Sequence, residues 1–141
     1  MNKLFAALVP LWLAGPARAA ETIQPGYWEA RDEVISPIHT SKVERRCITP
    51  REVDKFMSCH INHIYQCICP EQTARDGVVA FKGGCVDKKG HKVGISGRGA
   101  YTPTTLTMTA DFTFRLFGIP MSGEARTDAR RIGDVCPAGA P

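Results

Sequence analysis

The stretch CHINHIYQCIC, residues 59–69, contains the residue types best able to do chemistry in this chain. Thiolates and imidazoles bind soft metal ions, and closely spaced thiols carry redox reactions. Oxidised cysteines instead form a disulfide framework, which persists only where the surroundings are oxidising. The compartment in which the chain folds therefore decides among these three chemistries. The residues concerned are Cys59, His60, His63, Cys67 and Cys69.

The N-terminus has the parts of an export signal. Lys3 gives a positive start, an apolar stretch follows at 4–14, and Gly15-Pro16 breaks any helix. Ala17-Arg18-Ala19 places small residues where a signal peptidase reads, so we expect cleavage after Ala19. The apolar stretch is shorter than the roughly 20 residues that span a bilayer, and no later stretch could span one. We therefore expect a signal peptide at 1–19 and a single all-β exported domain at 20–141, periplasmic or secreted.

The charge of the exported chain argues against a nucleic-acid partner. Loss of Lys3 and Arg18 with the signal lowers the formal net charge from +4 to +2. Acidic residues are interspersed with the remaining basic ones, a pattern typical of solvated strand faces.

All six cysteines lie after the expected cleavage site, and an even number in an exported chain predicts three disulfides. They are Cys47, Cys59, Cys67, Cys69, Cys85 and Cys136.

The alternative is a soft-metal site, for copper or zinc, or a thiol redox centre within 59–69. Its ligands would be Cys59, His63, Cys67 and Cys69. On a strand, residues four apart lie about 13 Å from one another, too far to share one ion. On a helix only neighbouring i, i+4 residues could chelate, and a tetrahedral zinc site needs further ligands. Only Ile68 separates Cys67 from Cys69, whereas a thioredoxin-like motif has two intervening residues. The sequence therefore favours disulfides.

The sequence predicts strands over most of the chain. Residues 105–116 alternate completely, which predicts a long strand with one buried face. The residues on that face are Leu106, Met108, Ala110, Phe112, Phe114 and Leu116. Further strands are expected at 27–35, 42–48, 78–81 and 122–132. Turns are expected at 75–77, 88–90 and 118–120, and a bulge at Gly83-Gly84.

One short helix is expected near residues 50–58. Thr49 would be its N-cap, Pro50 its first residue, and Glu52 the partner in a capping box. Apolar residues then recur at helical spacing, at Val53, Phe56, Met57, His60, Ile61 and Ile64. The predicted fold is mainly β: a single antiparallel meander curled toward a barrel or half-barrel, crossed by this helix and stabilised by disulfides.

Three motifs resemble those of the domain of unknown function 3617 family, small exported bacterial proteins. They are residues 25–29 (PGYWE), 47–50 (CITP) and 131–137 (RIGDVCP). The resemblance spans the expected mature chain and implies an exported β-rich domain with no assigned reaction. The chain departs from the family in having an extra pair of cysteines around 59–69 and a valine inserted before Cys136.

The predicted strands suggest how the cysteines pair. A hairpin turning near Asp76-Gly77 would bring Cys69 opposite Cys85, although a small register shift would bring Cys67 there instead. Cys47 and Cys136 each end a strand and are expected to meet, which leaves Cys59 for Cys67.

No catalytic constellation is present, so we expect a non-enzymatic protein without a cofactor. The expected function is binding of a small apolar ligand or an envelope component. Possible ligand-lining residues are Trp28, Met108, Phe112, Phe114 and Met121. For Trp28 a structural role as a core anchor is the favoured interpretation.

Overall fold

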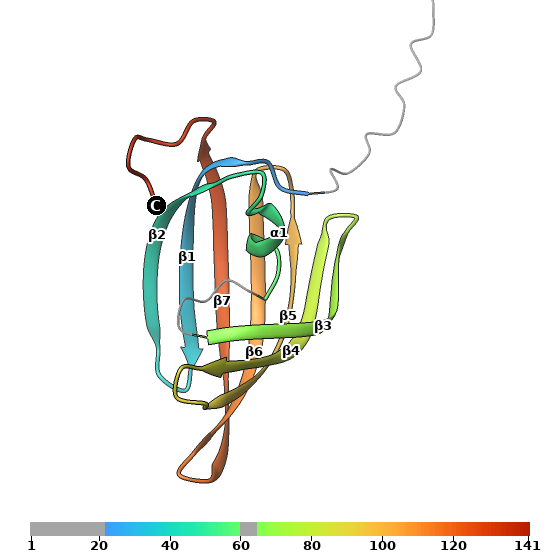
Figure 1. The fold of residues 1–141 in the computed structure, drawn as a ribbon, viewed down its shortest axis with the longest axis vertical. Helices are drawn as coiled ribbons and strands as arrows, with labels where there is room; N and C mark the ends of the chain where they lie inside the picture. Colours follow the sequence, from blue (N-terminus) through green and yellow to red (C-terminus); the bar gives the residue numbers. More distant parts are fainter. Residues whose placement is uncertain (1–21, 60–64) are drawn as a thin grey trace, which may run out of the picture.

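The computed structural model describes residues 22–59 and 65–141. The expected signal peptide at 1–19, its cleavage site, and His60, Ile61, His63 and Ile64 lie outside the described residues. The described part of the chain has seven strands and one helix (Figure 1). They are β1 (Gly26–Ser36), β2 (Thr40–Ile48), α1 (Val53–Phe56), β3 (Tyr65–Arg75), β4 (Val78–Asp87), β5 (Lys92–Tyr101), β6 (Thr105–Leu116) and β7 (Ile119–Gly133).

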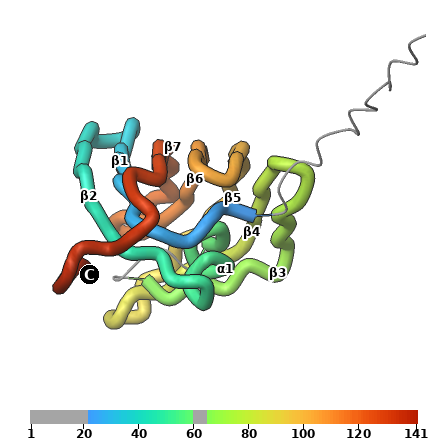
Figure 2. Tube along the Cα trace, turned by 90° about the horizontal axis from the view of Figure 1, so that it is seen from above, coloured from blue at the N-terminus to red at the C-terminus, as the bar shows by residue number. Residues whose placement is uncertain are grey.

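All seven strands form one antiparallel sheet in the order β2-β1-β7-β6-β5-β4-β3. Strands β3 to β7 follow one another as a meander, and the N-terminal hairpin β1–β2 joins it by pairing β1 with β7. Seen along the strands, the sheet follows an arc with α1 on its inner side (Figure 2). Because β2 and β3 remain edges, the barrel is open. The predicted mainly β, half-barrel fold with one short helix is confirmed.

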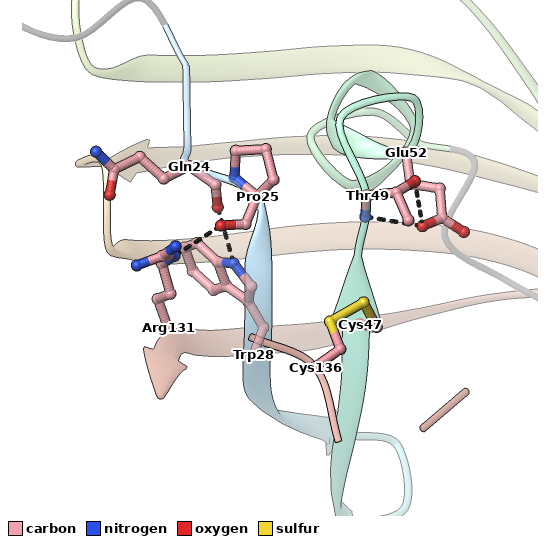
Figure 3. Close-up of a disulfide and its surroundings, with 8 residues drawn as sticks. All are labelled: Gln24, Pro25, Trp28, Cys47, Thr49, Glu52, Arg131 and Cys136. Carbon is pink, nitrogen blue, oxygen red and sulfur yellow. Dashed lines mark hydrogen bonds between the residues drawn. A yellow bond between two sulfur atoms is a disulfide. The ribbon is translucent and has the colours of Figure 1, made fainter. Parts of the chain in front are cut away.

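The core fills the concave side of the sheet next to α1. Trp28 and Leu106 are fully buried, and the Trp28 ring lies 5.8 Å from that of Phe56 on the helix. The Trp28 indole Nε1 donates a hydrogen bond to the Gln24 carbonyl at 3.0 Å (Figure 3). Trp28 therefore anchors the core, because its ring is removed from water and its single donor is satisfied.

The helix is shorter than expected and begins later. The Thr49 backbone N–H and hydroxyl both donate to Glu52 Oε2, at 2.9 and 2.8 Å (Figure 3). These two bonds lower the pKa of the Glu52 carboxyl. The Glu52 backbone N–H donates to the Thr49 carbonyl at 2.9 Å, so residues 49–52 form a turn, and the threonine hydroxyl donates to Glu52 rather than capping a helix N–H. The helix then starts at Val53, with Glu52 as its N-cap.

Segments from the two ends of the chain meet beside this turn. Cys47 and Cys136 form a disulfide, as predicted, and Arg131 Nε donates to the Pro25 carbonyl at 2.8 Å (Figure 3). Gly26 has a φ of 142°, and a Cβ there would lie 2.6 Å from the Gly133 carbonyl oxygen. The three sequence motifs that resemble the family therefore meet at one end of the sheet, where contacts between them link the N-terminal hairpin to the end of β7.

The other two disulfides correct the predicted pairing: Cys67 bonds Cys85 and Cys59 bonds Cys69. The favoured pairs Cys69–Cys85 and Cys59–Cys67 are wrong, whereas the alternative with Cys67 opposite Cys85 is right. The reason is a bulge in β3, where Ile68 pairs with Gly84 but the next pair is Glu71 with Lys82. This extra β3 residue shifts the register so that Cys67 faces Cys85.

That bulge contains Cys69 and Pro70, and it lies opposite Gly83 rather than at the predicted Gly83-Gly84. Proline suits a bulge because it has no N–H to donate to the ladder. A Cβ on Gly83 would lie 2.6 Å from Cys69 Cα and closer still to the Ile68 carbonyl oxygen. Only glycine leaves room for the bulged backbone and the Cys59–Cys69 disulfide.

Two hairpin turns have the left-handed backbone of a two-residue loop. Asp76-Gly77 has φ values of 54° and 77°, as its sequence predicts, and Phe117-Gly118 has 52° and 80°. The turn predicted at 118–120 is therefore wrong by one residue, and β7 begins at Ile119 rather than at 122. The strand predicted at 105–116 matches β6 at both ends.

We predict that Gly83→Ala lowers the free energy of unfolding by about 1–3 kcal/mol, because the backbone of the bulge must move to admit a methyl group. The neighbouring Gly84→Ala is the matched control, since its nearest non-bonded atom would be 3.7 Å away. Denaturant unfolding of both variants measures the difference. Equal stabilities would contradict the bulge as described.

The disulfide pairing can be tested on unreduced protein digested after Tyr65, Arg75, Lys82 and Lys88. Backbone fragmentation at Ile68, with the sulfur bonds kept intact, separates Cys67 from Cys69. We expect the fragment with Cys67 to carry the Cys85 peptide and the fragment with Cys69 to carry the Cys59 peptide. The reverse attachment would contradict the pairing of Cys67 with Cys85 in the β3–β4 register.

Candidate functional site

The helix α1 covers the concave face at one end only (Figure 1). The inward-facing side chains of β6 go from fully buried at Leu106, through half-buried at Phe112 and Phe114, to 47% exposed at Leu116. α1 packs over the first of these positions and does not extend to the last (Figure 1). The apolar pattern of the core thus continues beyond the part of the sheet that the helix covers.

Three inward-facing residues define the uncovered apolar surface: Phe112, Phe114 and Met121. The rings of Phe112 and Phe114 stack with centroids 6.0 Å apart, and Met121 pairs across the sheet with Phe114. All three side chains are half-buried. Ile95 of β5 pairs with Phe112 and extends the surface sideways. We call these four residues the open-end surface.

Polar side chains lie on the concave face beside the core. The Thr127 hydroxyl donates to Asp32 Oδ1 at 2.6 Å, joining β7 to β1 on the concave face. On β2 the inward side chains alternate in charge, since Glu44 forms ion pairs with both Lys42 and Arg46. The Arg46 guanidinium also lies 5.6 Å from the centre of the Phe56 ring, which links these side chains to the helix. A ligand on the open-end surface would therefore meet polar groups at its inner end.

The five predicted ligand-lining residues fall into two separate regions of the concave face. Trp28 and Met108 belong to the buried core, whereas Phe112, Phe114 and Met121 lie on the open-end surface. Trp28 pairs with Arg131 and Phe114 with Met121, so the two rings are ten residues apart along β7, roughly 33 Å. The five residues do not line one site.

The cysteines considered as metal ligands are all bonded to other cysteines. Cys59, Cys67 and Cys69 are in the two disulfides around the β3 bulge, so none of them presents a thiolate. His63 lies outside the described residues. Within 22–59 and 65–141 no three histidine, cysteine or acidic side chains gather closely enough to hold a metal ion.

The convex face carries a charge network across three strands. Glu29 accepts hydrogen bonds from Arg45 of β2 at 2.8 Å and from Arg130 of β7 at 2.9 Å. These two guanidinium groups lower the pKa of the Glu29 carboxyl. Glu29 is therefore held as a carboxylate that ties β1 to both neighbours, which is a structural role.

We predict that Glu29→Gln lowers the unfolding midpoint at neutral pH and that the deficit disappears in acid. A lowered pKa in the folded state gives stability above the carboxyl's ordinary pKa, and that stability is lost as the pH falls through the lowered value. Thermal unfolding from neutral to acidic pH tests this. Glu71→Gln, on edge strand β3 and in no ion pair among the described residues, is the control. A deficit that persisted unchanged in acid would contradict the charge explanation.

The sequence feature that pointed to the open-end surface is the length of the alternating apolar pattern in β6. Its alternation runs for twelve residues, and it continues past Thr113, the last residue of β6 that pairs with β5, whereas β7 pairs along its whole length. Leu116, Phe117 and Ile119 at the end of this hairpin were not singled out as functional residues from the sequence. Among the described residues, no helix is long and apolar enough to cross a membrane.

The fold and the open-end surface define a disulfide-stabilised, open antiparallel β-domain with one helix inside its curve. Residues 23–136 match the family described as "Protein of unknown function (DUF3617)". The chain belongs to that family, as the three motifs had indicated. Neither a curated protein nor a solved structure matches it.

Proposed function

We propose that the protein is an exported, non-catalytic binding domain whose ligand is a small apolar molecule or an apolar part of an envelope component. The observation that carries the proposal is the open-end surface, where Phe112, Phe114 and Met121 continue the core pattern beyond the part of the sheet that α1 covers. Apolar surface of this kind, bordered by polar groups, is typical of ligand sites. The three disulfides agree with a protein that folds in an oxidising compartment.

The chemistry of the surrounding side chains supports binding over catalysis. Asp32, on the concave face, accepts the Thr127 hydroxyl, and Glu44 forms ion pairs with Lys42 and Arg46. Thr127 lies four residues along β7 from Gly123, the partner of Phe112, so it offers a polar contact about 13 Å away for a ligand whose apolar part covers the open-end surface. The best ligand by this reasoning is amphipathic, with an apolar body and a polar head.

We predict that Nile red, an uncharged apolar dye, binds the oxidised protein and that Phe114→Ser weakens this binding about tenfold or more. Burying an aromatic side chain contributes about 1.5–3 kcal/mol, and 1.4 kcal/mol corresponds to a factor of ten. Fluorescence titration measures the dissociation constant. Phe117→Ser, a change of the same kind in the turn beyond the surface, should leave it unchanged.

Two results would count against the proposal: no saturable dye binding by the wild-type protein, or equal losses in the two phenylalanine variants. Circular dichroism and denaturant unfolding of Phe114→Ser show whether its sheet remains folded. Met121→Ser, across the sheet from Phe114, provides a second variant of the same surface if Phe114→Ser is unstable.

A further inference from the structure

We propose that the end of the β6–β7 hairpin, residues 115–120, docks into the interfacial layer of a lipid bilayer that carries anionic headgroups. We call these six residues the hairpin tip. The hairpin tip lies beyond the open-end surface and consists of different residues. The inference therefore does not depend on the proposed ligand site, and either can fail alone.

The hairpin tip projects past the rest of the sheet. Strand β5 pairs with β6 only as far as Gly94 with Thr113, and β1 pairs with β7 only as far as Ser36 with Glu124. Beyond these pairs, within the described part of the chain, β6 and β7 pair only with each other, and their turn extends below all other strands in Figure 1. The hairpin tip can therefore enter a layer of headgroups without the sheet following it.

Large apolar side chains are concentrated on the hairpin tip. Phe117 is 95% exposed, Ile119 64% and Leu116 47%. Phe117 also has a φ of 52°, a left-handed conformation that bulky residues rarely adopt and that asparagine or glycine adopts with less strain in this turn. An aromatic ring at the most projecting position, held there at a local conformational cost, indicates a role outside the fold.

The charges at this end of the molecule fit an anionic surface. From Phe112 to Gly123 the only charged residue is Arg115. Arg115 Nη1 donates to the Gly118 carbonyl at 2.9 Å, which uses one of the five guanidinium N–H donors. The remaining donors suit phosphate, and the apolar stem of an arginine can lie among acyl chains while its head stays at the interface.

The first carboxylates of the hairpin set a limit to the docking depth. Asp111 and Glu124 pair directly across the two strands and are both exposed. Anionic headgroups would repel this pair, so docking stops before it. The three residues from Arg115 to Phe117 span about 10 Å, which matches the 5–10 Å to which apolar side chains enter the boundary between headgroups and acyl chains.

The size of the hairpin tip argues against a protein partner or a second copy as its occupant. Stable protein interfaces use about 20–30 residues on each side, whereas the hairpin tip has six. A lipid surface needs no matching shape, because its molecules rearrange around a projecting apolar group.

Co-sedimentation of the oxidised protein with vesicles tests the proposal. We expect binding to vesicles of phosphatidylcholine mixed with phosphatidylglycerol, and weaker binding to phosphatidylcholine alone. Phe117→Ser should reduce binding to the mixed vesicles about tenfold or more, and Arg115→Gln should remove the preference for the anionic lipid. Val135→Ser is the control, because Val135 is 82% exposed but follows the opposite end of β7.

Wild-type protein that binds neither vesicle would overturn the proposal, as would equal losses in Phe117→Ser and Val135→Ser. A concentration-dependent dimer that Phe117→Ser abolishes would also overturn it, in favour of a second copy as the occupant. The dye titration separates this inference from the proposed function. We expect the Phe117→Ser variant to bind Nile red as the wild type does but to lose its sedimentation with vesicles.

Discussion

The pairing of the first strand with the last is the constraint on which the rest of the structure depends. β1 lies between β2 and β7, so the N-terminal hairpin joins the arc through the last strand of the meander. That pairing brings Trp28 to the concave face, where it packs against Phe56. The Cys47–Cys136 bond joins positions 89 residues apart, and closing a loop of that length in the unfolded chain contributes roughly 4–5 kcal/mol on the chain-entropy model.

The curvature of the sheet depends on large side chains facing glycines across adjacent strands. Phe81 pairs with Gly97 and Phe112 with Gly123, and in both cases the ring occupies the space where a Cβ would be. The glycines lose no packing there, because the aromatic ring across the strand covers them. A sheet built this way can bend tightly around a helix of four residues. Gly83 has a different purpose, since it makes room for bulged backbone rather than for a ring.

Such a small helix leaves the concave face unevenly covered, and both proposed sites follow from that. Next to the helix the face is a packed core, then it becomes polar around Asp32 and Glu44, and then apolar again at Phe114. Past the last pairs with β1 and β5, the hairpin alone continues to Phe117. The ligand site and the lipid-docking site are thus successive parts of one uncovered hairpin, with different degrees of exposure.

The local sequence pattern was sufficient to predict much of the architecture. Strict alternation set both ends of β6, and Asp76-Gly77 specified its turn, because each depends only on near neighbours. The even number of cysteines predicted full pairing of the six, and Cys47–Cys136 followed from the ends of two strands.

The remaining features depend on partners distant in the chain. The β3 bulge puts Cys67 opposite Cys85, where an unbulged strand would put Ile68, and a Cβ at Gly83 would clash with the bulged backbone. The projection of Phe117 depends on where β1 and β5 stop pairing, which the alternation within β6 cannot reveal. Sequence by itself determined which residues share a face, since side chains alternate along any strand. Only the tertiary structure decided which part of that face is covered, because coverage depends on the lengths and positions of the other elements.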